Sequence, residues 1–228
     1  MRKPSILLAL CVTAMLSLGT ILPAALAESA PAPAATQTPI PLKDMMRRYE
    51  DVLLGKHPYI QCNTYDAVYT EATLSNEITQ WYGYEFETPK EFTAFCLTDL
   101  DADGYPEIIL KLSDDFGFEL LRYENGTVYG FPFVARAMID ITLNGDIYGS
   151  SGVSDNGWYQ IRFHENGYTL TETCRMQSAD NGGVQYFIGE KEASQSEYEA
   201  FTNGFADRQR PLWLAYTKEN LAAVVSRF

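Results

Sequence analysis

The sequence predicts an α+β fold that is mostly β: an antiparallel β meander with short helices at its N- and C-terminal ends. Short apolar runs rich in β-branched and aromatic residues follow one another from residue 92 to residue 173. Asn-Gly dipeptides, which accept the positive φ angles of a two-residue type I′ turn, separate many of these runs. Apolar residues at helical spacing occur before and after this region.

Residues 1–27 have the features of a bacterial secretory signal peptide. A basic start is followed by a long uncharged apolar stretch and by an A-x-A cleavage site at 25–27, so we expect cleavage before Glu28. The alternative is an uncleaved membrane anchor, because the apolar stretch is long enough to span a bilayer. Lipidation at Cys11 is disfavoured, since Leu10 stands where a small residue is needed.

The N-terminal part of the secreted chain is expected to be a tether and a helix. Residues 28–41 are rich in Ala, Pro and Thr, a composition that cannot form a core and is typical of a semi-extended linker. Apolar residues spaced three or four apart predict a helix over 42–54, which Gly55 ends. A second short helix is expected within 73–82. We assign residues 42–228 to a single β-rich domain.

The central region is predicted to form strands joined by tight turns. The predicted strands are 92–98, 107–112, 118–123, 127–129, 139–143, 158–163 and 168–173. Five Asn-Gly turns are expected, at 125–126, 144–145, 156–157, 166–167 and 181–182. Turns this short indicate antiparallel neighbours, because parallel strands need longer and usually helical crossovers. The same alternation argues against a helix at 88–91, where the sequence resembles a capping box.

The C-terminal part is predicted to be helical again. Ser194 and Glu197 form a capping box, which opens a helix with Tyr198 and Phe201 on one side. Thr217 is a suitable N-cap for a last helix that extends through Val225.

The net charge of the chain limits the classes of molecule that it is expected to bind. The chain has 17 Lys and Arg against 30 Asp and Glu, and cleavage of residues 1–27 removes two basic residues and no acid, which leaves a net charge of −15. Such a polyanion disfavours nucleic acids and anionic lipids and favours a cation. No second apolar run of about 18 residues exists, so no transmembrane span is expected after cleavage.

The cysteine and histidine content gives little support to redox or zinc chemistry. Cys62, Cys96 and Cys174 remain after processing, and an odd number cannot form a complete disulfide framework, although one bridge is compatible with export. Cys96 lies in an apolar strand and is expected to be a buried thiol. No C-x-x-C pair occurs, and the only histidines, His57 and His164, are far apart in the sequence.

The acidic segment 99–107, Asp-Leu-Asp-Ala-Asp-Gly-Tyr-Pro-Glu, carries the clearest chemistry. Carboxylates stand at relative positions 1, 3, 5 and 9, and the glycine at position 6 permits a sharp turn. Crowded carboxylates repel one another unless a cation with oxygen ligands neutralises them, and Ca²⁺ fits better than Mg²⁺, which demands a tight octahedron. The expected ligands are the carboxylates of Asp99, Asp101, Asp103 and Glu107 with the backbone carbonyl of Tyr105. The alternative is an acidic surface turn without a metal.

This segment resembles the D-x-D-x-D-G-x-x-[DE] strand–loop–strand calcium sites of FG-GAP/VCBS-type repeats. The resemblance implies ligation by the five residues just named, with a structural ion. An EF-hand is excluded, because position 12 is Leu110 instead of Glu. The motif occurs once, so the resemblance covers the loop and its hairpin and not a propeller. The layout also resembles uncharacterised exported proteins of Gram-positive bacterial type. The matching residues are Tyr186, Ile188, Gly189, Ser194, Glu197 and Tyr198.

Other candidate sites are weaker. Trp81, Tyr82, Trp158 and Tyr159 are candidate stacking platforms for sugars or peptides, although the chain has many aromatic residues and core packing is the more common role. A G-x-S-x-G nucleophile motif is missing, because the glycines of the segment 149–152 stand too close together.

The sequence therefore favours an exported non-enzymatic module with one structural Ca²⁺ loop, acting as a binding or interaction protein at the cell envelope or outside the cell. The alternative is an extracytoplasmic hydrolase acting on glycans or peptides. A protease-inhibitor or assembly-partner role is a third option.

Overall fold

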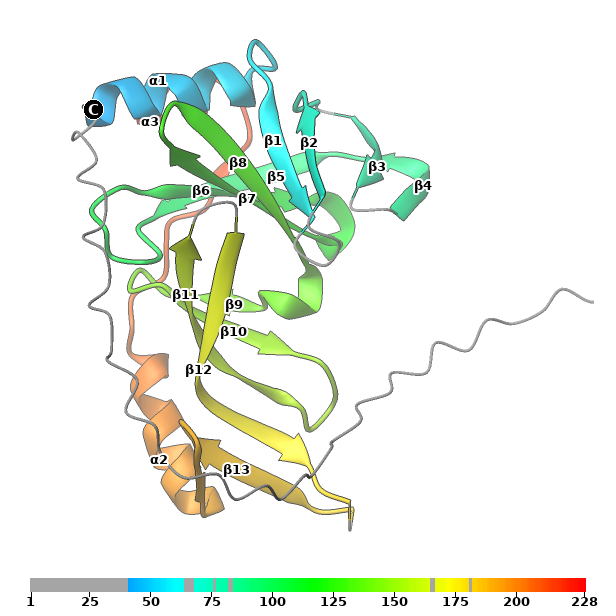
Figure 1. Ribbon diagram of the computed structural model, residues 1–228, viewed down its shortest axis with the longest axis vertical. Helices are drawn as coiled ribbons and strands as arrows, with labels where there is room; N and C mark the ends of the chain where they lie inside the picture. The colour runs from blue at the N-terminus through cyan, green and yellow to red at the C-terminus, as the bar shows by residue number, and fades with distance from the viewer. Residues whose placement is uncertain (1–40, 64–67, 76, 82–83, 165–166, 181) are drawn as a thin grey trace, which may run out of the picture. The chain divides into compact units, whose positions relative to one another are not determined.

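The computed structural model describes residues 41–63, 68–75, 77–81, 84–164, 167–180 and 182–228 (Figure 1). The predicted signal peptide 1–27 lies outside the described residues, as does the predicted linker 28–41 except for Pro41. The described residues belong to one compact unit.

A seven-stranded sheet, called here the first sheet, has the strand order β15-β5-β6-β7-β8-β1-β2. Its strands are β1 (Tyr59–Asn63), β2 (Val68–Ala72), β5 (Phe92–Thr98), β6 (Glu107–Leu112), β7 (Gly117–Glu124), β8 (Thr127–Val134) and β15 (Leu214–Ala215). Neighbouring strands are antiparallel except β1 and β8, which run parallel with Ile60 opposite Tyr129. Two short 3₁₀ turns, Ser113–Asp115 and Ala135–Ala137, lie next to these strands.

A six-stranded sheet, called here the second sheet, is an antiparallel meander with the order β14-β13-β12-β11-β10-β9 (Figure 1). Its strands are β9 (Asp140–Ile141), β10 (Asp146–Ser150), β11 (Asn156–His164), β12 (Gly167–Ser178), β13 (Val184–Ile188) and β14 (Lys191–Ala193). A separate hairpin consists of β3 (Ile78–Trp81) and β4 (Tyr84–Lys90).

The described residues also form three α-helices: α1 (Leu42–Leu53), α2 (Gln195–Ala206) and α3 (Lys218–Val225). The capping box of α2 is present, since the Ser194 N–H donates to Glu197 Oε2 at 2.8 Å and the Glu197 N–H donates to Ser194 Oγ at 3.3 Å. Thr217 caps α3 by accepting from the Asn220 N–H at 3.2 Å. The structure thus confirms the three helices predicted at 42–54, after Ser194 and after Thr217.

The predicted fold class is confirmed, and several local predictions are corrected. The Asn125-Gly126 turn joins β7 to β8 with φ values of 50° and 91°. The helix expected within 73–82 is wrong where residues are described, because 78–81 form β3, in which β-branched Ile78 pairs with Lys90 of β4. The turn expected at 156–157 is also wrong. Both residues lie in β11, where a side chain at 157 would meet the Cys174 carbonyl oxygen at 2.3 Å.

The first sheet is covered on both faces. On one face, side chains such as Ile108 and Leu110 pack against α1 and α3. On the other, the intervening Ile109 joins a core that includes Ile141, Ile147 and Ile161 of the second sheet. A third core lies between α2 and the second sheet, where Phe205 stacks on Trp158 with ring centroids 4.4 Å apart. The loop between β5 and β6 lies beside the core shared by the two sheets, because Leu100 belongs to that core.

Candidate metal centre

The acidic loop joins β5 to β6 and is shaped by its own carboxylates. Thr98 and Glu107 form the last pair of the ladder before the loop opens. The Asp99 carboxylate accepts hydrogen bonds from the N–H groups of Asp103, at 3.1 Å, and Gly104, at 3.0 Å. Gly104 has a φ of 90°, a value that favours glycine, so the sharp turn expected at this position is present.

Three carboxylates converge inside the loop. Oxygen atoms of Asp99, Asp101 and Glu107 all lie within 4.8 Å of one another. Two oxygens on opposite sides of a Ca²⁺ ion, each bonded at about 2.4 Å, are separated by about 4.8 Å. The observed spacing is therefore compatible with one cation held among the three side chains.

Burial makes the ionised forms of Asp101 and Glu107 unfavourable. Glu107 is only 2% exposed. The pKa of Glu107 is raised to about 9, mainly by desolvation and also by the charges of Asp101 and Asp103. The Leu100 N–H, which donates to Glu107 Oε2 at 2.9 Å, acts in the opposite direction. Desolvation also raises the pKa of Asp101, as do the neighbouring aspartates.

One oxygen of the cluster lacks a hydrogen bond. Asp101 Oδ1 is buried and has no hydrogen-bond partner among the described residues. A buried polar atom without a partner costs about 1–3 kcal/mol, and more when it is charged. This orphaned oxygen is an observation separate from the clustering, and a bound cation would satisfy it.

Two arginines lie near the loop but leave its charge largely uncompensated. Arg162 directs Nη1 to the backbone carbonyl oxygen of Asp101 at 3.4 Å, instead of to a carboxylate. The positive charge of Arg122 lowers the pKa of both Asp101 and Glu107, while its guanidinium packs over the Phe163 ring at 4.5 Å. The sequence spacing gave no signal for either arginine, because they come from β7 and β11.

Of the five predicted ligand residues, three have side chains in the acidic cluster and two have side chains outside it. Asp99, Asp101 and Glu107 form the cluster. Asp103 is exposed, and its Oδ1 accepts from the Tyr105 N–H at 2.8 Å. Tyr105 is partly buried and packs against the core next to α1. The expected ligand set therefore remains a prediction as a whole, while three of its members lie together.

The aromatic candidates lie mainly in cores. Trp81 is 2% exposed, and its Nε1 donates to Glu119 Oε2 at 2.8 Å. Trp158 stacks on Phe205 and is also buried. Tyr159 is partly buried, and Tyr82 lies outside the described residues. The two indoles therefore offer little open ring surface to a sugar or peptide.

A glycan hydrolase requires a pair of carboxylic acids across a cleft. The linings of two cavities in the described part of the chain do not contain such a pair. A cavity of about 320 Å³ is lined by Leu53, Leu54, Leu74, Ser75, Tyr216, Thr217, Lys218 and Leu221. These residues include no acid. The lining of a second cavity, of about 180 Å³, includes one acid, Glu77. Neither cavity supplies the pair.

The three cysteines expected in the secreted chain are buried and free: Cys62, Cys96 and Cys174. The prediction of a buried thiol at Cys96 is confirmed. Desolvation raises the pKa of the Cys62 and Cys96 thiols to about 12, so neither is an activated nucleophile.

Comparison with models of protein families, with curated proteins and with solved structures gives no match. Within the described part of the chain, no helix has both the length and the apolarity needed to cross a membrane.

Proposed function

We propose that this chain is an exported, non-enzymatic module that holds one structural Ca²⁺ in the 99–107 loop and binds a ligand at the cell envelope or outside the cell. The observation that carries the metal site is the convergence of Asp99, Asp101 and Glu107 oxygens within 4.8 Å. The export signal and the net charge of the secreted chain support the location and the preference for a cation.

Calcium suits the loop better than magnesium for two reasons. Ca²⁺ accepts six to eight oxygen ligands in flexible geometry, so the cluster can be completed by the Asp103 carboxylate, the Tyr105 carbonyl or water. Mg²⁺ demands six ligands at about 2.1 Å and keeps several of its waters. Extracellular calcium modules bind with dissociation constants of about 10⁻⁴ to 10⁻³ M, a range that suits an exported protein.

The stabilisation expected from the ion is modest. At a free concentration ten times the dissociation constant, binding to the folded state alone adds about 1.4 kcal/mol to the free energy of unfolding. This amount holds a loop in place without defining the fold.

A calcium titration of the melting temperature tests the metal site. The chain that begins at Glu28 should melt at a higher temperature with Ca²⁺, and the isosteric double variant Asp101→Asn/Glu107→Gln should not respond. A matched control is Asp114→Asn/Asp115→Asn, which likewise replaces two carboxyl groups by amides, but at exposed residues outside the cluster. An equal calcium response in the wild type and the Asp101/Glu107 variant would show that the loop is not the site.

The binding role and the export are tested separately. N-terminal sequencing of the secreted protein should begin at Glu28. Cell-surface extract passed over the immobilised chain, with and without a chelator, should yield a partner whose retention is saturable and is competed by the free chain. A retained Met1 would contradict processing, and retention of no saturable partner would contradict the binding role.

A further inference from the structure

Leu100 connects the acidic loop to the second sheet. Its neighbours in the sequence, Asp99 and Asp101, direct carboxylates into the acidic cluster. Leu100 itself is 2% exposed and belongs to the core that contains Ile141 and Ile147. The same three residues thus form part of the cation site and part of the contact between the two sheets.

The turn between β9 and β10, residues 142–145, packs directly against this stretch of the loop. A Cβ atom at Gly145 would lie 1.9 Å from the Leu100 carbonyl oxygen, so only glycine permits the approach. Gly145 also has a φ of 77°. From the neighbouring strand β11, Arg162 reaches the Asp101 carbonyl oxygen at 3.4 Å. Backbone and side-chain contacts therefore both tie the loop to the second sheet.

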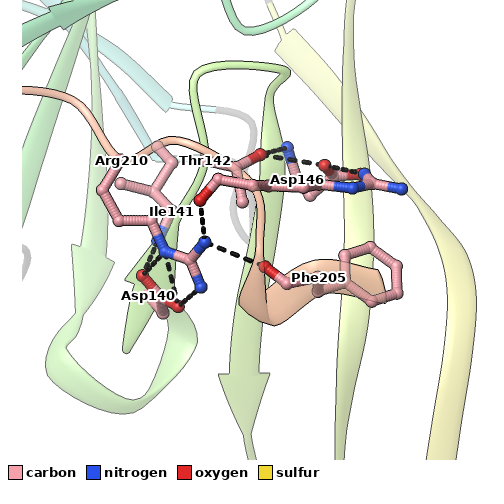
Figure 2. A network of polar contacts seen from close by, with 7 residues as sticks. Asp140, Ile141, Thr142, Asp146, Phe205 and Arg210 are labelled. Atoms are coloured by element: carbon pink, nitrogen blue, oxygen red, sulfur yellow. Dashed lines mark hydrogen bonds and ion pairs between the residues drawn. The ribbon is translucent and has the colours of Figure 1, made fainter. Parts of the chain in front are cut away.

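The opposite side of the turn is held by the segment 207–213, which leads from α2 to β15 (Figure 2). Arg210 makes a bidentate ion pair with Asp140, with Nη2 at 2.6 Å from Oδ2 and Nε at 3.0 Å from Oδ1. Asp146 is fully buried and pairs with Arg208, while it accepts from Thr142 Oγ1 at 2.9 Å.

The same segment returns to the first sheet. The Leu143 N–H donates to the Gln209 carbonyl oxygen at 2.8 Å. Beyond residue 213, β15 pairs with β5, with Leu214 opposite Phe95. Since β5 leads into the acidic loop, the turn is enclosed between the loop on one side and a segment anchored to the same strand on the other.

We propose that cation binding in the 99–107 loop fixes the β9–β10 turn, and with it the second sheet, against the first sheet. This inference rests on the proposed calcium site. Withdrawal of the turn from Leu100 moves the backbone that carries Asp99 and Asp101, and so separates their carboxylates from Glu107. Because the ion needs all three oxygens, opening of the contact and loss of the ion are one event.

Hydrogen exchange on the chain that begins at Glu28 measures this coupling. Samples contain either a chelator or free Ca²⁺ at ten times the dissociation constant determined by calorimetry. The Thr142 and Gly145 N–H groups, bonded to Asp146 O at 2.9 Å and Thr142 O at 3.1 Å, should exchange about 11-fold more slowly with Ca²⁺. The Gly189 N–H, bonded to Thr173 O at 2.8 Å, is the internal reference and should not change.

A variant that displaces the turn tests whether ion binding depends on the turn. Gly145→Ala places a methyl group against the Leu100 carbonyl and forces the turn away from the loop. Because withdrawal of the turn separates the carboxylates, this variant should bind Ca²⁺ more weakly than the wild type, and the same free Ca²⁺ should slow exchange at Thr142 by much less than about 11-fold. An unchanged dissociation constant would contradict the coupling. If this variant does not fold, Arg162→Gln, which removes only the contact from β11, should show a smaller slowing than the wild type.

Failure of the coupling and failure of the calcium site give different results. Binding of one Ca²⁺ with slowed exchange in both the loop and the turn supports the coupling. Binding of Ca²⁺ with slowed exchange confined to residues 99–107 would overturn the coupling and leave the calcium site intact. Failure of calorimetry to detect binding would overturn the calcium site and, with it, this inference.

Discussion

Glu119→Gln should make the protein more stable at alkaline pH. Glu119 lies in β7 with no exposed surface, and its Oε2 accepts from Trp81 Nε1 at 2.8 Å. Its other oxygen, Oε1, is buried without a hydrogen-bond partner in the described part of the chain. The Tyr59 hydroxyl lowers the pKa of the Glu119 carboxyl, but less than Trp81 does. Desolvation is the larger effect and raises the pKa of Glu119 to about 8.

The sign and size of the effect follow from proton linkage. The unfolded chain has a glutamate pKa of about 4.3, so between this pH and pH 8 the folded state holds a proton that the unfolded state has lost. The free energy of unfolding therefore falls as pH rises through this interval, by about 1.4 kcal/mol per pH unit. Over the whole interval the loss from Glu119 amounts to about 5 kcal/mol. Gln does not titrate and keeps an oxygen acceptor for Trp81.

Urea denaturation at pH 5, 6, 7 and 8, with a chelator and at constant ionic strength, measures this difference. The free energy of unfolding of the variant should exceed that of the wild type by an amount that grows with pH up to about pH 8. Other buried carboxyls titrate in both proteins and cancel in the difference. Glu87→Gln, a change at an exposed glutamate of β4, is the control and should follow the wild-type curve. Parallel pH curves for wild type and Glu119→Gln would refute the reasoning.

Three further substitutions test packing, capping and charge pairing, each by urea or thermal denaturation. Gly145→Ala should lower the free energy of unfolding by about 2–3 kcal/mol, because its Cβ would overlap the Leu100 carbonyl. Gly182→Ala is the comparison, with a φ of 81° and open space around the Cβ, and should lower it by about 1 kcal/mol. Equal losses in the two variants would contradict the contact between Gly145 and Leu100. Ser194→Ala should cost about 1 kcal/mol by removal of the α2 capping box, and an unchanged melting temperature would argue against the cap. Arg208→Met should cost about 2 kcal/mol, because it leaves buried Asp146 without its cation, and a neutral effect would contradict that pairing.

Features set by neighbouring residues were predictable from the sequence. The strands 92–98 and 107–112 have the predicted bounds, since two short apolar runs flank the acidic loop that separates them. The hairpin turn at Asn125-Gly126 and the cap at Ser194 likewise depend on residues a few positions apart. The acidic loop belongs to this class, because its spacing places three carboxylates together.

Features set by tertiary contacts were not predictable in this way. The parallel pairing of β1 with β8 joins strands separated by more than 60 residues. Asn156-Gly157 has a turn sequence, yet it lies in a strand because Gly157 allows close approach of β12. The partners of the acidic loop, Gly145 and Arg162, are brought to it only by the packing of the second sheet on the first.

The proposed binding of one Ca²⁺ in the 99–107 loop can be observed residue by residue. It is tested most directly by NMR titration of the ¹⁵N-labelled chain with Ca²⁺, in which the amide signals of Leu100 and Gly104 are followed. We predict saturable shifts with 1:1 stoichiometry and a dissociation constant of about 10⁻⁴ to 10⁻³ M, and no saturable shifts in Asp101→Asn/Glu107→Gln. Shifts that do not saturate in the wild type, or that are the same in the double variant, would show that the loop does not bind Ca²⁺.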